Sequence, residues 1–184
     1  LRPEHGKIVV NGATGGVASL GIDMLAGLGF QVTAITGKDD EHGYLKDLGA
    51  NEILSRGAVE MGTRPLEKML WAGALDSVGG EALAWLTRTM QQNGVIASFG
   101  NAGGIELKTT VLPFILRGVR LIGVESGYTA MPLRRKIWER LASDLKPRHL
   151  ADIATTIDFA DLPPVFDKVL KAQVRGRTVV KIAA

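Results

Sequence analysis

The stretch VVNGATGGVAS, residues 9–19, places a glycine-rich turn directly after a short apolar run. Residues Ala13–Ala18 fit the pattern G-x-G-x-x-G/A, with Gly15 where a pyrophosphate approaches the backbone. Ala13 replaces the first glycine, and Gly12 before it can supply the tight turn. A helix that begins here directs its N-terminal N–H groups at the phosphates, whereas a turn that only packs the helix on a sheet is the alternative. The predicted pyrophosphate contacts are Thr14, Gly15, Gly16 and Val17.

The residues after the second apolar run indicate which nucleotide would bind. An enzyme that uses NAD often has an acid about 20 residues after the turn, where it accepts from the ribose 2′-hydroxyl. This sequence has Thr36, Gly37 and Lys38 there, and an ammonium group would attract the 2′-phosphate of NADPH. Arg56 is either a second ligand of that phosphate or a solvated loop residue. The pattern favours NADPH, whereas Asp39 would favour NAD if the second strand ran longer.

The residues that several other chemistries require are missing. A short-chain dehydrogenase needs Tyr-x-x-x-Lys, but Leu48 follows Tyr44 at that spacing and Pro132 follows Tyr128. The stretch TGKDD lacks the earlier glycine and the following hydroxyl of a P-loop. Cysteine is absent, and the three histidines have no metal-ligand spacing, so we expect no metal site.

The composition argues against nucleic-acid and membrane partners. The 22 basic and 19 acidic residues are interspersed, and their net charge of +3 forms no basic block. No apolar run approaches the roughly 20 residues of a membrane span, and no signal-peptide pattern opens the chain. We therefore expect a cytoplasmic protein with a small-molecule substrate. Because the first residue is Leu1 rather than Met, we also expect that the natural start lies upstream.

Short apolar segments alternate with helical patterns along most of the chain. Six segments bounded by Gly, Asn or Asp are expected to be strands: Lys7–Asn11, Gln31–Ile35, Glu52–Leu54, Ala74–Val78, Gly94–Phe99 and Arg120–Val124. Helical spacing predicts helices over Gly16–Leu28, Asp40–Leu48, Pro65–Trp71, Gly80–Met90 and Val111–Leu116. This alternation predicts an α/β Rossmann fold, a doubly wound parallel sheet with strand order 3-2-1-4-5-6.

The pattern changes after the sixth strand. The remaining residues predict an amphipathic helix over Pro132–Leu145, an extended segment Ile153–Phe159, a helix opened by Asp161 and a strand Thr178–Ile182. These elements lie outside the six-stranded count. We therefore divide the chain into a dinucleotide-binding domain, residues 1–150, and a C-terminal tail, residues 151–184.

Several stretches of this sequence closely resemble one enzyme family: NGATGGVAS, YLKDLGANEILSR, RPLEKMLWAGALDSVGGEAL, TTVLPFILRGVRLIGVES and RGRTVVKI. They are similar to the zinc-free quinone-oxidoreductase branch of the medium-chain dehydrogenase/reductases, and most closely to its NADPH-dependent acryloyl-CoA reductases. The resemblance runs from about Pro3 to Ile182. It implies a GroES-like catalytic domain upstream, on which the tail would pack.

The resemblance also implies roles for individual residues. Lys38 and Arg56 match the family's contacts to the 2′-phosphate, and Gly15 to Val17 match its pyrophosphate turn. Further cofactor contacts are implied at Ser77, Val78, Gly79, Phe99, Gly100 and Arg177. Phe99 and Gly100 would approach the nicotinamide. Arg177 is also the one candidate contact to substrate, and the resemblance identifies no other catalytic residue in this sequence.

The implied reaction is hydride transfer from NADPH to the β-carbon of an α,β-unsaturated acyl-CoA, such as acryloyl-CoA. Donors to the developing enolate would come mainly from the upstream domain, so we expect these 184 residues alone to be inactive. A quinone oxidoreductase of the same fold and a non-catalytic NADPH-binding module are the alternatives. The family joins two sheets at the sixth strand, so we expect a homodimer through VRLIGVES.

Overall fold

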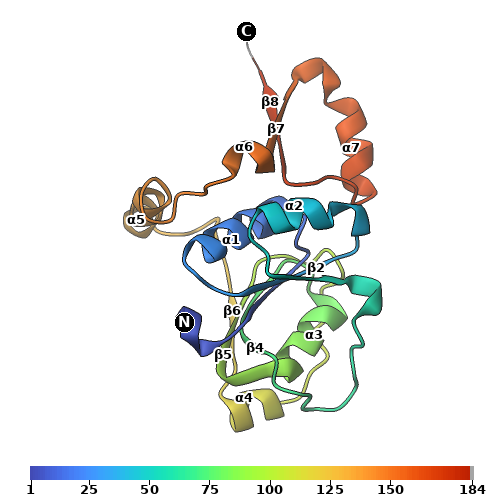
Figure 1. Cartoon of the computed structure of the whole chain (residues 1–184), viewed down its shortest axis with the longest axis vertical. Helices are drawn as coiled ribbons and strands as arrows, with labels where there is room; N and C mark the ends of the chain where they lie inside the picture. Colours follow the sequence, from blue (N-terminus) through green and yellow to red (C-terminus); the bar gives the residue numbers. More distant parts are fainter. Residues whose placement is uncertain (183–184) are drawn as a thin grey trace.

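The computed structural model describes residues 1–182, which form a six-stranded parallel sheet and a smaller two-stranded sheet (Figure 1). The six strands are β1 (Ile8–Asn11), β2 (Val32–Thr36), β3 (Glu52–Ser55), β4 (Trp71–Asp76), β5 (Met90–Ser98) and β6 (Arg120–Gly123). Their order is β3-β2-β1-β4-β5-β6, and every neighbouring pair is parallel. The predicted Rossmann fold and its strand order are confirmed. The direction of winding reverses between β1 and β4, which is where such sheets bind ligands.

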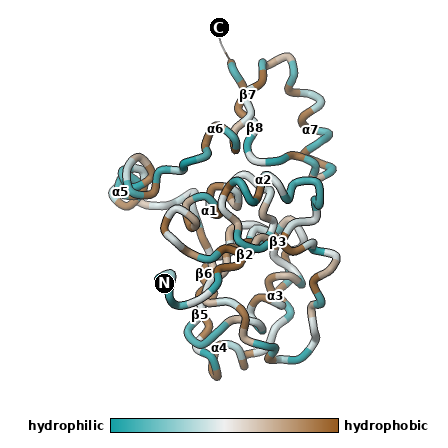
Figure 2. The backbone as a smooth tube through the Cα atoms, viewed as in Figure 1, coloured by the Kyte–Doolittle hydropathy of each residue, from teal (hydrophilic) through white to brown (hydrophobic). Residues whose placement is uncertain are grey.

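Helices pack on both faces of this sheet: α1 (Gly16–Gly27), α2 (His42–Asp47), α3 (Gly80–Thr89) and α4 (Leu112–Arg117). Successive side chains of a strand point to opposite faces, so neighbouring residues of β1 enter different cores. Val10 belongs to one core cluster with Ile22 of α1, and Val9 belongs to the other with Leu86 of α3. Figure 2 shows apolar stretches of the chain along the sheet between these helices. Both clusters hold the ends of the strands in fixed positions.

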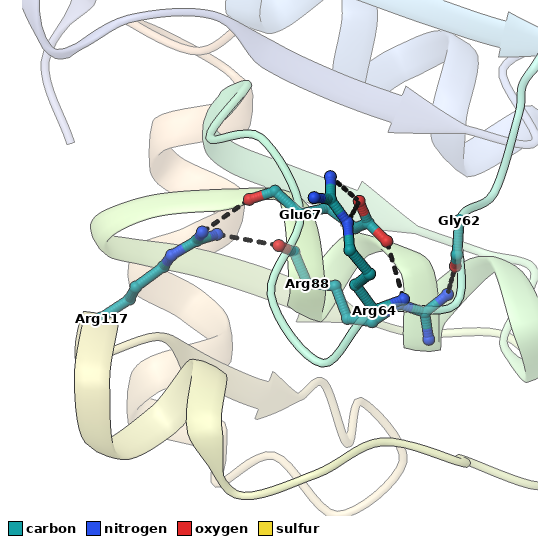
Figure 3. A network of polar contacts seen from close by, with 5 residues as sticks. All are labelled: Gly62, Arg64, Glu67, Arg88 and Arg117. Atoms are coloured by element: carbon teal, nitrogen blue, oxygen red, sulfur yellow. Dashed lines mark hydrogen bonds and ion pairs between the residues drawn. The ribbon is translucent and has the colours of Figure 1, made fainter.

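The connection between β3 and β4 is not the helix that the sequence predicts over Pro65–Trp71. Residues 65–70 form a loop, and Trp71 begins β4. The Glu67 N–H donates to the carbonyl of Arg88 at the end of α3, at 2.9 Å. Arg117 of α4 donates to the carbonyls of Glu67 and Arg88 at 2.6 and 2.8 Å, as Figure 3 shows. The prediction was wrong because hydrogen bonds to distant elements replace those of a local helix.

The C-terminal tail forms a separate small unit beyond α1 and α2 (Figure 1). Helix α5 (Met131–Leu141) precedes the tail. The tail itself contains α6 (Leu150–Ile153), which begins one residue before it, β7 (Ala154–Asp158), α7 (Pro163–Leu170) and β8 (Arg177–Lys181). Strands β7 and β8 pair in parallel, and α7 connects them. The predicted elements are therefore present, although α5 ends at Leu141 rather than at Leu145.

The tail is anchored on the larger sheet unit at one side. Ile153 is 1% exposed and belongs to the core cluster that contains α1 residues. The Gly176 N–H donates to the carbonyl of Thr14 at 2.9 Å. On α7, in contrast, Phe166 is 56% exposed and Leu170 is 85% exposed. The tail thus contacts the nucleotide-binding unit and also presents an uncovered apolar surface.

A buried carboxylate fixes the segment between α5 and α6. Asp23 lies on α1 with 0% of its surface exposed. It accepts hydrogen bonds from Arg148 Nε at 3.1 Å and from the His149 N–H at 3.0 Å, and His149 Nδ1 lies 2.9 Å from Oδ1. Burial by itself raises the pKa of the Asp23 carboxyl, but the hydrogen bonds from His149 and Arg148 outweigh it and lower that pKa. The ionised form of Asp23 is therefore the one that the fold stabilises.

Candidate functional site

A cleft of about 890 Å³ opens at the carboxyl ends of the central strands. Gly12 follows β1, Gly37 follows β2, Arg56 follows β3 and Ser77 follows β4, and all four residues line the cleft. The cleft therefore lies at the point where the strand order reverses. Ligands of open α/β sheets bind at this position because two loops diverge there and leave space between them.

The glycine turn between β1 and α1 forms the floor of this cleft. Gly12 has φ +70°, and a Cβ on it would overlap Ser77 Oγ, so this position requires glycine. The Gly15 N–H donates to the carbonyl of Gly12 at 2.9 Å, and Gly15 is the N-cap of α1. The first N–H groups of a helix have no partner within the helix. The turn thus presents backbone donors to the cleft, as an anion-binding turn must.

A buried carboxylate that the sequence analysis missed holds the two loops of the cleft together. Asp76 ends β4 with 0% exposure, and its carboxylate accepts from Asn11 Nδ2 at 3.1 Å. It also accepts from the N–H groups of Val78 and Gly79 at 3.2 and 3.0 Å. Ser77 Oγ donates back to the Asn11 carbonyl at 2.9 Å. The available signal was the stretch DSVGG, in which Asp76 precedes two adjacent glycines by three residues.

Lys38 and Arg56 place two cations at the end of the cleft formed by β2 and β3. The Arg56 guanidinium lies beside Gly37, where a Cβ would be 3.5 Å from Arg56 Cζ. Lys38 Nζ donates to the carbonyl of Val174 in the tail at 2.6 Å. Burial lowers the pKa of the Lys38 ammonium, and Arg56 adds to this effect, while Glu41 and Asp40 oppose it. Lys38 and Arg56 thus lie together at this end of the cleft, where they can contact an anionic group, and Asp39, Asp40 and Glu41 line the cleft beside them.

Asp39 is the residue that would support NAD instead. Strand β2 ends at Thr36, and a 3-10 turn begins at Asp39, so the strand does not extend to this acid. Asp39 Oδ1 accepts a hydrogen bond from Ser55 Oγ and lies 3.6 Å from His42 Nε2. It still lines the cleft. Ser55 and His42 therefore contact one side of the Asp39 carboxylate, so that only part of it faces the cleft.

The cleft brings together eight of the predicted cofactor-binding residues: Thr14, Gly15, Gly16, Gly37, Lys38, Arg56, Ser77 and Val78. Val17, Thr36, Gly79, Phe99, Gly100 and Arg177 do not line it. Thr36 is buried beneath it and accepts from the Lys38 N–H at 3.0 Å. Phe99 and Gly100 line a separate cavity of about 500 Å³ with residues 123–125. Arg177 lies against the turn, since a Cβ on Gly16 would be 2.9 Å from its Nε.

One wall of the cleft comes mostly from residues that the sequence analysis did not assign to the site. Residues 169, 171–174 and 176 of the tail line it opposite the glycine turn and Lys38. Gly15 and Gly176 form a parallel bridge across this junction. Gly176, together with Arg177, matches a glycine-basic pair that in the resembling family reaches back toward the cleft, but no local motif marks residues 169 and 171–174.

Residues 1–182 contain neither a candidate metal site nor a candidate membrane span. No group of three or more His, Asp or Glu side chains in this range lies close enough together to hold a metal ion. No helix in the same range is both long enough and apolar enough to cross a membrane.

Comparison with known proteins gives consistent matches across the chain. The model of a family described as zinc-binding dehydrogenase matches residues 16–144. A probable acrylyl-CoA reductase, AcuI of Escherichia coli, is 44% identical over 182 residues, which are 99% of this chain and 56% of that protein. A putative quinone oxidoreductase, YhfP of Bacillus subtilis, is 44% identical over 184 residues, with the same coverage of both chains. The chain thus spans little more than half the length of these relatives.

Solved structures with similar sequences have the same fold. The YhdH oxidoreductase of Salmonella enterica in complex with NADP is 50% identical and superposes with a TM-score of 0.94. The Bacillus YhfP protein with NAD bound is 42% identical and also gives a TM-score of 0.94. Each match covers 99% of this chain and 56% of the solved chain.

Proposed function

Because the chain belongs to the zinc-binding dehydrogenase family, we propose that its cleft binds NADPH for a reductase that acts on α,β-unsaturated acyl-CoA substrates such as acryloyl-CoA. The observation that carries this proposal is the joint placement of the glycine turn, Lys38 and Arg56 around one cleft. The turn offers backbone donors to the pyrophosphate, and the two cations offer charge to the 2′-phosphate. The AcuI and YhdH relatives, by their names and bound nucleotide, support the same assignment.

We place most of the nucleotide site on residues 1–150 and the main packing surface for a catalytic domain on the tail, residues 151–184, from which Arg177 also reaches the cofactor. The exposed Phe166 and Leu170 of α7 support this division, because uncovered apolar surface commonly marks an interface. Thr14, Gly15, Gly16 and Val17 would hold the pyrophosphate, and Thr36, Gly37, Lys38 and Arg56 the adenosine ribose and its phosphate. Ser77, Val78, Gly79, Phe99, Gly100 and Arg177 would extend along the rest of the cofactor.

A quinone substrate is the second candidate, and the similarity to YhfP favours it. Both reactions use the same nucleotide half-site, so they differ in the pocket for the acceptor rather than in the cleft described above. A non-catalytic NADPH-binding module would use the same cleft and would differ by lacking turnover in the whole protein. The location that we propose for all three is the cytoplasm.

Lys38 is expected to set the preference for NADPH over NADH. The variant Lys38→Ala should bind NADPH about 5- to 150-fold more weakly, since a charge-assisted contact contributes about 1–3 kcal/mol. Its affinity for NADH should change little because NADH has no 2′-phosphate. Isothermal titration calorimetry with both nucleotides measures the two affinities. The variant Lys46→Ala, which removes an exposed lysine from α2, is the matched control. Equal affinities for NADH and NADPH that Lys38→Ala leaves unchanged would refute the assignment.

We further propose a homodimer in which two copies join their sheets at β6. Within residues 1–182 this strand pairs with β5 and leaves its other edge open, and Ile122 and Val124 are 49% and 50% exposed. Open apolar edges of this kind tend to be paired. Light scattering should give the mass of a dimer, and Ile122→Lys should give a monomer, while Leu150→Lys at an equally exposed position should not. A monomeric wild-type chain at high concentration would contradict the proposal.

A further inference from the structure

The tail segment, defined here as Val169–Gly176, is held against the nucleotide cleft by contacts at three points. The Gly176 N–H donates to the carbonyl of Thr14 at 2.9 Å, next to the glycine turn. Lys38 Nζ donates to the carbonyl of Val174 at 2.6 Å. Arg175 Nη1 lies 3.1 Å from Glu41 Oε2. The segment therefore connects the floor of the cleft with its cationic end.

Arg175 holds the segment through Glu41, which lines the cleft, and through the ring of Tyr44, but Arg175 does not itself line the cleft. Its guanidinium carbon lies 4.7 Å from the centre of the Tyr44 ring, and Tyr44 is itself buried between α2 and the core. Arg175 is not among the residues that line the cleft, whereas Lys38 and Val174 are. The structure therefore separates an anchor of the segment, Arg175, from a contact that a bound nucleotide would meet, Lys38.

Lys38 has bonding capacity that this contact does not use. An ammonium group has three N–H donors, and the carbonyl of Val174 accepts one of them. A carbonyl is neutral, so it satisfies a donor without compensating the charge. Lys38 is half-buried, and burial lowers the pKa of its ammonium group, while the nearby Glu41 and Asp40 raise it. A phosphate beside Lys38 would supply negative charge and accept a hydrogen bond from a second N–H of the ammonium group, while the contact with the Val174 carbonyl remains.

We propose that Lys38 is a positioning residue that couples the 2′-phosphate of the cofactor to the tail segment. The proposal rests on the proposed NADPH site. With the phosphate bound, Lys38 bridges the phosphate and the Val174 carbonyl and holds the segment closed. Arg177 follows the segment directly at the start of β8 and lies against Gly16 of the turn. Recognition of the phosphate at the cationic end of the cleft thereby fixes Arg177 beside the glycine turn, and NADH fills the cleft without this effect.

Hydrogen exchange at the Gly176 amide tests the coupling, because that N–H is protected by its bond to Thr14 only while the segment is closed. The two probes are adenosine 2′,5′-bisphosphate and adenosine 5′-monophosphate, which differ only in the 2′-phosphate. Each is used on the full 184-residue chain at a concentration that gives equal, near-saturating occupancy by calorimetry. We expect exchange at Gly176 to be about tenfold slower with the bisphosphate, which corresponds to one charge-assisted hydrogen bond.

Two variants separate this coupling from general stabilisation of the tail. Lys38→Gln should give the same exchange rate with both probes at equal occupancy. Arg175→Gln should speed exchange with both probes and leave their roughly tenfold ratio unchanged. Equal exchange in the wild-type chain with both probes would overturn the inference, and so would faster exchange with the bisphosphate, which would mean that phosphate and Val174 compete for Lys38. Failure of either probe to bind, seen by calorimetry beforehand, would instead count against the proposed NADPH site.

Discussion

Replacing Asp23 with alanine is expected to lower the free energy of unfolding by about 3 kcal/mol at neutral pH, and the unfolding midpoint by about 6–12 °C. The carboxylate has no exposed surface, and it satisfies the His149 N–H as well as Arg148. Without the carboxylate, the part-buried His149 N–H loses its hydrogen-bond acceptor, and a cavity forms beside α1. Half of the Arg148 side chain is exposed, so Arg148 can turn to water, which places the loss at the lower end of the range for buried pairs.

The same carboxylate makes this part of the stability depend on pH. Its pKa in the folded chain is lowered, whereas an unfolded Asp has a pKa of about 3.9. A lowered folded pKa gives stability that is complete above the unfolded value and is lost as the pH falls through the folded value. The difference between wild type and Asp23→Ala should therefore be constant near neutral pH and shrink below about pH 4. Thermal unfolding of both proteins over this range measures it, and a difference that persists unchanged in acid would contradict this account.

Asp144 provides a control of the same residue type. It pairs with Arg140 at 2.7 Å on the surface of the chain, and the hydrogen bond from Arg140 lowers its pKa as well. Exposed pairs contribute little because water and salt screen them. Asp144→Ala should leave the unfolding midpoint unchanged within error. A fall similar to that of Asp23→Ala would show that net charge, rather than the buried contact, controls the midpoint.

The features of the cleft that depend on residues close together in the sequence could be predicted from it. The turn between β1 and α1 needs glycine at a fixed spacing after a strand. The position of Lys38 follows from the end of β2, two residues before it. The sheet order followed from the alternation of strands and helices. Each of these follows from steric or periodic rules that operate over a few residues.

Features that depend on distant residues could not be predicted in this way. Lys38 and Val174 are separated by 136 positions, and nothing near either residue signals their contact. The loop at residues 65–70 has a helical spacing of apolar residues, but Arg117 of α4 and the end of α3 bind its backbone instead. Asp76 carries no periodic signal, and its role depends on where β1 and β4 come together. Tertiary hydrogen bonds decide all three cases.

The last prediction is that the 184-residue chain, expressed by itself, binds NADPH but does not reduce acryloyl-CoA at a measurable rate. The turn, Lys38 and Arg56 all belong to one sheet unit, so the nucleotide half-site should form from these residues. The cavity beside Phe99 and Gly100, where we propose that the nicotinamide lies, is separate from the cleft and has half-exposed Val124 at its edge. Nothing among residues 1–182 closes over it as a second wall.

Hydride transfer needs such a wall because the acyl thioester must be oriented against the nicotinamide and shielded from water. Loss of this positioning removes a factor of about 10⁵ or more from the rate, since effective molarities of well-oriented groups reach that range. The absorbance of NADPH during incubation with acryloyl-CoA measures turnover, with the AcuI protein of Escherichia coli as the positive control. Calorimetry on the same sample establishes that the nucleotide is bound. Steady oxidation of NADPH at a rate comparable to that of the control would show that the catalytic groups lie within these 184 residues, and that the proposed division between nucleotide and catalytic domains is wrong.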